Sequence, residues 1–339
     1  MEVPAEIIET VKRFTRPVIV GHVRPDADCL GSMLAFGGTL QSRGVQAAVS
    51  LPEGTVSRRL SFLPEWAGLR GARDADFRAA DGFIVVDTAK LSRCSVAKPL
   101  GEDWLAGRPL VNIDHHESNT LFGRVNWVVP QASSSAELIY RVIRAAGWDL
   151  SPRIAALLYA GVHSDTIGFS LPTTTADALE AAATLVRAGA DVNAVGMHLY
   201  RNHSRNEFEL LRLIYDNTRV TPDGQIAYST ASHAELTRLG CSAADIDDQV
   251  NIPRSVDGIR LAILFTEGRP GRTRVNLRGE RGTTVLPIAL ALGGGGHVQS
   301  AGAIIDAPLD EAVLRVLAQA AVHMTNRPHS IDAGASAGR

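Results

Sequence analysis

The sequence predicts an α/β protein whose larger N-terminal domain has a mostly parallel sheet flanked by helices, followed by a smaller α/β domain. Two short apolar segments, Gly82–Val86 and Pro109–Ile113, end abruptly at acidic residues. Stretches with apolar residues at helical spacing separate such segments. Near-continuous apolar strands that alternate with helices are typical of a parallel sheet covered on both faces.

Length and composition limit the class of protein. A chain of 339 residues is about twice the length of a typical domain, so two domains are expected. Charged residues make up 21% and the formal net charge is −2, which excludes a uniformly basic polyanion binder. The apolar runs are short and the N-terminus is acidic, so no membrane association and a cytoplasmic location are expected. Cys29, Cys94 and Cys241 lie far apart and predict neither a disulfide framework nor a zinc site.

The first domain is assigned to residues 1–190. Its expected strands are Val18–Val20, Val45–Leu51, Gly82–Asp87 and Pro109–Ile113. Its expected helices lie around Ala5–Phe14, after Gly21–Ser32, over Ala136–Arg144, from Pro152 to about Gly161, and within Thr174–Gly189. The serines before Ala136 are good helix caps.

A linker and a second domain follow. Residues 191–222 are helical in pattern but rich in charge, and predict a helical linker. The pair Asp223-Gly224, between two strand-like segments, indicates a hairpin that opens the second domain, residues 223–326. Its other expected elements are strands Ile259–Phe265, Arg272–Arg278 and near Ala303–Ile305, and helices Val285–Leu292 and Leu309–His323. The Ala-, Gly- and Ser-rich tail, residues 327–339, is expected to be disordered.

Acidic and imidazole side chains gather where the predicted strands and one helix end. They are His22, Asp26, Asp28, Asp87, Asp114, His115, His116 and Asp165. Because the carboxyl ends of parallel strands lie along one edge of a sheet, these groups are expected to meet in space. Structural alternatives exist, since Asp28 and Asp87 could cap helices while Asp26 and Asp165 could belong to turns. The joint occurrence of all these groups favours a functional site.

Such a cluster indicates bound metal. Neighbouring carboxylates raise one another's pKa, and a cation removes that cost. Oxygen and nitrogen ligands without thiolate favour Mn²⁺ or Mg²⁺ over structural zinc, and histidine favours Mn²⁺. There are too many ligands for one ion, and two ions roughly 3.5 to 4 Å apart form the usual site for hydrolysing phosphate esters or anhydrides. We therefore expect two Mn²⁺ ions, with Mg²⁺ or another divalent ion as the alternative.

The order of these residues resembles the DHH phosphoesterase superfamily. The shared pattern is His22-x-x-x-Asp26-x-Asp28-x-x-Gly-Ser32, then Asp87, then Asp114-His115-His116, then Asp165-Thr-x-x-Phe169. In the second domain, Gly293–His297 followed by Ala301-Gly302 resembles the DHHA1 substrate domain. The resemblance extends from about residue 16 to residue 325.

The resemblance implies a role for each residue of the pattern. One ion would bind His22, Asp26 and Asp87, and the other would bind Asp28, Asp87, His115 and Asp165. His116 would stabilise charge at the scissile phosphate or protonate the leaving oxygen, and Asp114 would orient the pair. Residues implied in substrate binding are Arg278, Gly295, Gly296 and His297, and Ser32 at a helix start leaves room for a phosphate.

Length and the second domain indicate the NrnA-like branch of this superfamily. Resemblance to that branch implies degradation of short RNA oligonucleotides to nucleoside 5′-monophosphates. It also implies activity on 3′-phosphoadenosine 5′-phosphate (pAp) or on linear and cyclic dinucleotides, and a homodimer. One alternative is a short-range single-stranded DNA exonuclease of RecJ type. Another is a nucleotide-binding regulator that has lost hydrolysis.

Overall fold

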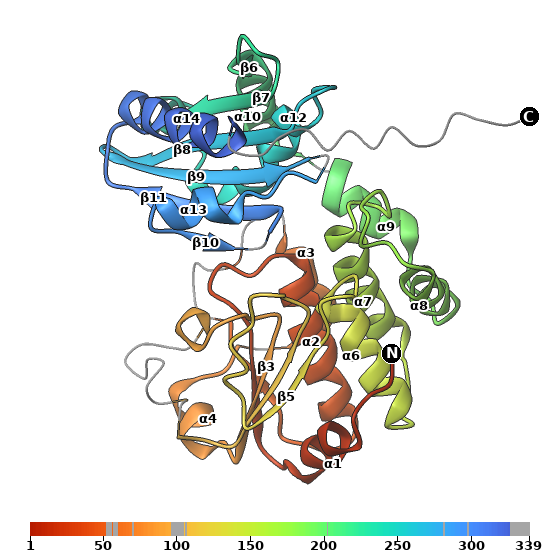
Figure 1. Cartoon of the computed structure of the whole chain (residues 1–339). Helices are drawn as coiled ribbons and strands as arrows, with labels where there is room; N and C mark the ends of the chain where they lie inside the picture. The colour runs from red at the N-terminus through yellow and green to blue at the C-terminus, as the bar shows by residue number, and fades with distance from the viewer. Residues whose placement is uncertain are drawn as a thin grey trace, which may run out of the picture. The chain divides into compact units, whose positions relative to one another are not determined.

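The computed structural model describes residues 1–51, 56, 60–69, 71–95, 105, 107–201, 203–280, 282–296 and 298–325. The chain divides into two compact units, Met1–His203 and Ser204–Arg339 (Figure 1). The predicted linker, residues 191–222, contributes elements to both units, and the predicted domain boundaries stay predictions. The predicted disordered tail, residues 327–339, lies outside the described residues.

The first unit contains a five-stranded sheet in the order β2-β1-β3-β4-β5, and every pairing in it is parallel. The strands are β1 Pro17–Val20, β2 Ala48–Val49, β3 Gly82–Val86, β4 Leu110–Asp114 and β5 Val125–Val128. Val20 pairs with Val85, and Val86 pairs with Ile113, so β1, β3 and β4 end at nearly the same level. The predicted α/β class with a mostly parallel sheet is confirmed.

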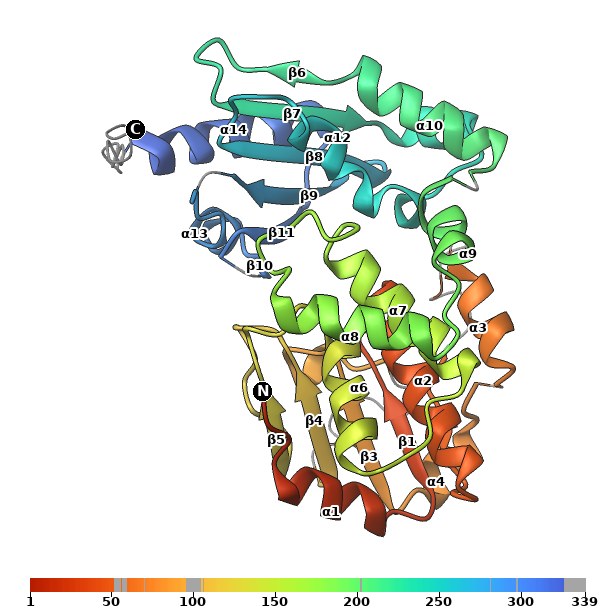
Figure 2. The same ribbon diagram turned by 90° about the vertical axis from the view of Figure 1, so that its right-hand side faces the viewer.

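Helices cover both faces of this sheet (Figures 1 and 2). The helices described in this unit are α1 Ala5–Arg13, α2 Ala27–Ser42, α3 Phe62–Ala67, α4 Asp74–Ala79, α6 Ser135–Ala145, α7 Pro152–Asp165, α8 Ala176–Arg187 and α9 Val192–Gly196. The 3₁₀ turn η2 spans Leu91–Arg93, and the π-helical turn η3 spans Met197–Arg201. Within the described residues, no helix is both long enough and apolar enough to cross a membrane.

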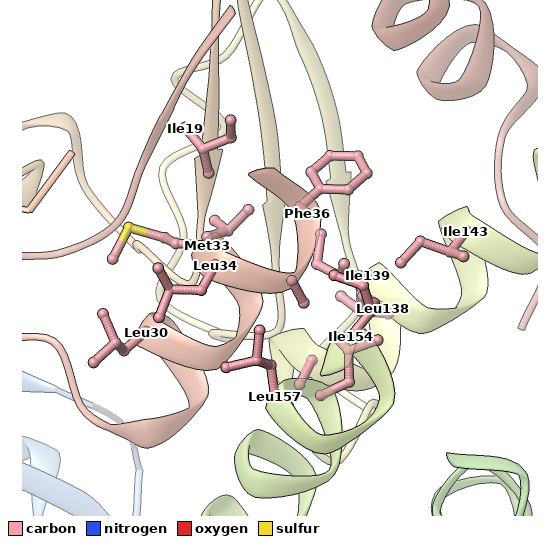
Figure 3. Close-up of a cluster of buried hydrophobic side chains, with 14 of the residues drawn as sticks. Ile19, Leu30, Met33, Leu34, Phe36, Leu138, Ile139, Ile143, Ile154 and Leu157 are labelled. Carbon is pink, nitrogen blue, oxygen red and sulfur yellow. The ribbon is translucent and has the colours of Figure 1, made fainter. Parts of the chain in front are cut away.

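Alternate strand residues face opposite layers of the first unit. Ile19 and Ile84 belong to a buried cluster with residues of α2, α6 and α7. Figure 3 shows Ile19 close to α2, and Leu157 of α7 on the side of α2 away from the sheet. Val18 and Phe83 belong to a second cluster that includes Phe77 of α4. The sheet is therefore buried on both faces, as its continuous apolar strands predict.

Two glycines allow α2, α6 and α7 to approach closely. A Cβ atom on Gly31 of α2 would lie 2.5 Å from the carbonyl oxygen of Leu157 on α7. A Cβ atom on Gly161 of α7 would lie 2.6 Å from the Ala136 Cβ on α6 and 2.8 Å from the Asp28 Oδ1. The absence of both side chains brings the start of α2 and the start of α6 close to the end of α7.

The second unit contains a mixed six-stranded sheet in the order β10-β11-β9-β8-β7-β6, in which only the β7–β8 pairing is parallel. Its strands are β6 Arg219–Val220, β7 Ile226–Ala231, β8 Leu261–Arg269, β9 Arg272–Gly279, β10 Gly295–Gly296 and β11 Ser300–Ile305. Its helices and 3₁₀ turns are α10 Arg205–Asp216, α11 His233–Arg238, η4 Ala243–Asp245, η5 Asp247–Val250, α12 Asn251–Arg254, α13 Leu286–Ala291 and α14 Leu309–Thr325. The hairpin predicted at Asp223-Gly224 joins β6 and β7, with Gly224 at φ 71°.

Some elements differ from the sequence predictions. The strand expected over Val45–Leu51 pairs only at Ala48–Val49, and β5 was not predicted. Helix α7 continues to Asp165 instead of ending near Gly161. Part of the glycine run, Gly295–Gly296, forms the short strand β10, which was not among the expected strands.

Candidate metal centre

The loop between β1 and α2 contributes the first three polar side chains. Asp26 is the N-cap of α2, and its Oδ1 accepts a hydrogen bond from the Cys29 N–H at 3.0 Å. Asp28, for which capping of this helix was the structural alternative, instead lies in the first turn and is buried. His22 is also buried, and its Nδ1 lies 2.9 Å from the Val23 carbonyl oxygen.

Asp28 reaches from α2 to the start of α6. Its Oδ2 accepts a hydrogen bond from the Ser135 N–H at 2.7 Å, and its Oδ1 accepts one from the Ala136 N–H at 2.8 Å. Burial raises the pKa of Asp28 well above its ordinary value, and the charges of Asp87 and Asp165 raise it further. The positive end of the α6 dipole therefore faces a carboxyl group that burial and its neighbours discourage from ionising.

Asp87 follows β3 and lies between two imidazoles. Its Oδ2 is 3.4 Å from the Nε2 of His22, and its Oδ1 is 3.5 Å from the Nε2 of His115. Burial alone would raise the pKa of Asp87, but hydrogen bonds with His115 and His22 lower it well below its ordinary value. Its φ of 51° is strained for a residue with a side chain, and such strain is common at functional sites.

In the Asp114-His115-His116 segment, the His115 ring faces Asp165 and Asp28, whereas the His116 ring contacts Asp114. The Nε2 of His115 is 3.5 Å from the Asp165 Oδ2 and 3.9 Å from the Asp28 Oδ2. The Nδ1 of His116 is 2.7 Å from the Oδ1 of Asp114, which is fully buried at the end of β4. Burial would lower the pKa of His115, but Asp165, Asp87 and Asp28 raise it well above its ordinary value.

Asp165 is the last residue of α7. Burial raises the pKa of its carboxyl to about 6, although His115 opposes this shift. The chain then turns through three left-handed residues, Ile167, Gly168 and Phe169, at φ 47°, 64° and 66°. The Thr166 hydroxyl accepts a hydrogen bond from the Phe169 N–H at 3.1 Å, which holds this turn beside Asp165.

The predicted ligands therefore converge. Three overlapping groups in the described residues could each hold an ion, namely His22–Cys29–Asp87, Asp87–His115–His116 and Asp28–His115–Asp165. Asp26 lies beside the first group, with its Oδ2 3.8 Å from the Nε2 of His22. We use the term candidate metal centre for His22, Asp26, Asp28, Asp87, His115 and Asp165. The contact between Nδ1 of His22 and a main-chain carbonyl leaves Nε2 toward the carboxylates, as is usual for a metal-binding histidine.

Sequence reasoning missed three side chains at this centre. The Ser135 hydroxyl donates to Asp87 Oδ1 at 3.1 Å, but the serine run was interpreted as helix caps alone. The Asn119 amide donates to Asp114 Oδ2 at 2.6 Å and to the Thr88 carbonyl at 3.1 Å, and no spacing indicated it. Cys29 lies next to Asp28 in the sequence, and only the fold brings its thiol near His22 and Asp87.

The residues predicted to contact the substrate lie on several elements of both units. Ser32 is fully buried, and its hydroxyl lies 3.4 Å from the Asp28 Oδ1. Arg278 lies on β9 and pairs with Ser300 of β11. Gly295 and Gly296 form β10, while His297 lies outside the described residues. Their roles in substrate binding stay predictions.

Comparison with known proteins decides the family. Residues 16–162 match the model of the DHH family, N-terminal domain. The bifunctional oligoribonuclease and PAP phosphatase NrnA of Mycoplasma genitalium is 30% identical over 305 residues, which cover 88% of this chain and 92% of that relative. This chain belongs to the DHH phosphoesterase family. The resemblance seen in the sequence is thereby confirmed, and Asp114-His115-His116 is its DHH motif.

A second relative and a solved structure are also similar to this chain over most of its length. The bifunctional oligoribonuclease and PAP phosphatase NrnA of Bacillus subtilis is 28% identical over 305 residues, covering 88% of this chain and 92% of that relative. The fold matches the crystal structure of an exopolyphosphatase-related protein from Bacteroides fragilis with a TM-score of 0.82 and 24% identity. That match covers 94% of this chain and 96% of the other, so the shared fold includes both units.

Proposed function

We propose that this DHH protein is a metal-dependent phosphoesterase that hydrolyses short oligoribonucleotides to nucleoside 5′-monophosphates. We further propose that it removes the 3′-phosphate from pAp. The observation that carries the proposal is the convergence of buried carboxylates and imidazoles on Asp87. Similarity over 88% of the chain to two relatives named oligoribonuclease and PAP phosphatase supports the choice of substrates.

The proposed centre holds two divalent ions. His22, Asp26 and Asp87 would bind one ion, and Asp28, Asp87, His115 and Asp165 would bind the other. The oxygen and nitrogen donors fit Mn²⁺, with Mg²⁺ or another divalent ion as the alternative. When bound, such ions supply charge neutralisation at the phosphate and activate the attacking water.

His116 is the proposed proton donor to the leaving oxygen. Its Nδ1 is held by Asp114 at 2.7 Å, so Nε2 is the ring nitrogen left to contact the leaving oxygen. Asp114 is in turn fixed by Asn119 at 2.6 Å. This chain of hydrogen bonds orients the ring before substrate arrives, which reduces the entropy lost on reaching the transition state.

The proposed phosphate contacts of the second unit are Arg278, Gly295, Gly296 and His297. Main-chain N–H groups of a glycine strand can approach a phosphate closely because no side chains intervene. A substrate of a few nucleotides needs few such contacts, and the net charge of −2 is compatible with one local site.

A substrate panel tests the proposal. The purified full chain is incubated with Mn²⁺ and, separately, with dinucleotide RNA, trinucleotide RNA, pAp, cyclic di-AMP, single-stranded DNA or pyrophosphate. We expect nucleoside monophosphates from both RNAs and AMP from pAp, and loss of both reactions after chelation. Faster hydrolysis of long single-stranded DNA would favour a RecJ-type exonuclease instead. Nucleotide binding without any hydrolysis would identify a regulator and contradict the proposal.

A further inference from the structure

The three serines at the start of α6, Ser133, Ser134 and Ser135, have three different hydrogen-bonding roles. Ser134 is the N-cap, and its hydroxyl accepts the Glu137 N–H at 3.1 Å. The N–H and hydroxyl of Ser133 both donate to Glu137 Oε2, at 2.9 and 2.8 Å. The Ser135 hydroxyl instead donates out of the turn, to Asp87 Oδ1. All three serines are fully buried, so these bonds are shielded from water.

Ser135 contacts two carboxylates that come from different elements. Its main-chain N–H donates to Asp28 Oδ2 at 2.7 Å, and its hydroxyl donates to Asp87 Oδ1 at 3.1 Å. The neighbouring Ala136 N–H donates to the other oxygen of Asp28 at 2.8 Å. One residue therefore links the first turn of α2 to the residue that follows β3.

The two linked carboxylates need such support. Asp87 has a strained φ of 51°, a conformation that persists only where surrounding contacts hold it. Its Oδ1 also lies 3.5 Å from His115 Nε2 and 3.6 Å from His116 Nδ1, so rotation of the carboxylate would change both contacts. A hydroxyl donor on Oδ1 limits that rotation. The donors on both oxygens of Asp28 limit its rotation in the same way.

The turn formed by Ser133, Ser134 and Ser135, here called the serine turn, is held in place by residues outside the candidate metal centre. Glu137 is fully buried, and its Oε1 accepts hydrogen bonds from Arg141 Nη2 at 2.7 Å and Nε at 3.1 Å. Arg141 Nη2 also lies 3.0 Å from Asp177 Oδ2 on α8. This network ties the turn to α6 and α8, so Ser135 presents its donors from a fixed backbone.

We propose that Ser135 is a positioning residue that sets Asp28 and Asp87 at the spacing required for the pair of ions. The inference rests on the proposed two-ion function and adds a residue outside the DHH pattern. Partners that orient metal ligands typically contribute about 10- to 100-fold to metal affinity. The hydroxyl can be removed without changing either main-chain donor, so substitution isolates the contact with Asp87.

The test is a titration of the full chain with Mn²⁺, with free Mn²⁺ counted by electron paramagnetic resonance and no substrate present. We expect Ser135→Ala to bind Mn²⁺ about 10- to 100-fold more weakly than wild type. The metal-free variant should still unfold cooperatively, at a lower midpoint than wild type because the buried Asp87 loses a hydrogen-bond donor. Unfolding shows whether the variant folds, and Mn²⁺ affinity is a readout that a merely structural role would not move.

Ser134→Ala is the matched control, because it removes a neighbouring buried hydroxyl that caps α6 by accepting the Glu137 N–H, whereas the Ser135 hydroxyl donates to Asp87. It should lower the unfolding midpoint and leave Mn²⁺ affinity unchanged. Wild-type affinity in Ser135→Ala would overturn the inference, as would an equal loss of affinity in Ser134→Ala. Wild-type protein that binds no Mn²⁺ would overturn the proposed function itself, which separates the two failures.

Discussion

The positions of His116 and Asp114 depend on Asn119, which lies outside the DHH motif and contacts it through Asp114. Asn119 donates to Asp114 at 2.6 Å and to the Thr88 carbonyl at 3.1 Å, and its Oδ1 accepts hydrogen bonds from the Asn112 amide and the Leu121 N–H. Loss of this amide would leave the buried Asp114 with one fewer donor and free it to rotate.

We predict that Asn119→Ala lowers kcat about 10- to 100-fold, because outer partners of catalytic side chains have effects of that size. KM for a dinucleotide should change little, since Asn119 orients the proton donor instead of binding the substrate. Steady-state kinetics with dinucleotide RNA provide the measurement. Asn217→Ala removes a comparable half-buried amide in the second unit and should reduce stability without this loss of kcat. An unchanged kcat in Asn119→Ala would contradict the proposed role.

The raised pKa of Asp165 predicts that metal binding depends on pH. Burial is the main reason that the pKa of its carboxyl is raised to about 6. A divalent ion must displace the proton, so Mn²⁺ affinity should be full above that pKa and should fall as the pH decreases below it. Titrations of the full chain in buffers on either side of pH 6 would measure this. Asp165→Asn, which cannot titrate, should bind Mn²⁺ more weakly and lose this part of the pH dependence. Wild-type affinity that stayed constant across the pKa would contradict the assignment.

The metal-free protein should show the opposite trend in stability from the same residue. A folded-state pKa above the unfolded value means that Asp165 stabilises the fold at pH values below its unfolded pKa, about 3.9. That contribution is lost as the pH rises through about 6. Bound ions reverse this effect because they compensate the carboxylate charge.

Residues at strand ends could be predicted from the sequence, and their supporting partners could not. His22, Asp87 and His115 follow apolar strands, and parallel strands necessarily end along one edge. The contacts of Ser135 with Asp28 and Asp87 span 107 and 48 residues of sequence, and no local pattern encodes them. The N-cap of α2 is Asp26, whereas the structural alternative from the sequence was a cap at Asp28. The start of α2 depends on backbone geometry that composition does not specify.

At the scale of elements, the close packing of α7 against α2 and α6 positions Asp165 and Asp28. Gly161 lies where α7 meets α6, and any side chain there would contact the Ala136 Cβ at 2.6 Å and the Asp28 Oδ1 at 2.8 Å. Neither contact can be relieved by the far end of a flexible side chain. The helix axes would have to move apart.

Gly161→Ala should therefore lower the free energy of unfolding by about 1–3 kcal/mol, the usual cost of overpacking a core. It should also weaken Mn²⁺ binding, because Asp28 is displaced. Chemical denaturation and metal titration would measure the two effects. Gly196→Ala is a suitable control, since in the described part of the chain no heavy atom beyond its chain neighbours and its own helix backbone lies within 4 Å of the position of its Cβ, and it should be neutral or stabilising. Equal stability of Gly161→Ala and wild type would contradict the packing argument.

The strongly apolar elements were predictable, while short or mixed elements were not. β3 and β4 could be predicted from their continuous apolar runs, because a strand buried on both faces requires apolar residues throughout. β5 has the sequence Val-Asn-Trp-Val and is an edge strand with partly exposed residues, so it lacks that signal. The extension of α7 to Asp165 was missed because its last turn, Val-His-Ser-Asp, is mostly polar.

At the scale of the whole molecule, length predicted two domains, and the chain divides into two compact units with the chain boundary between His203 and Ser204. Each unit has its own buried clusters, which explains why both could be anticipated from separate apolar patterns. The homodimer implied by the resemblance stays a prediction, as does the cytoplasmic location.

Release of nucleoside 5′-monophosphate from dinucleotide RNA tests the central claim most directly, with the full chain and Asp87→Ala compared in Mn²⁺ and in chelator. The proposed role of Asp87 in both ion sites predicts turnover by the wild type in Mn²⁺ only. It predicts no detectable turnover by Asp87→Ala, although this variant should remain folded. Failure of the wild type to release mononucleotide, or substantial activity in Asp87→Ala, would contradict the account.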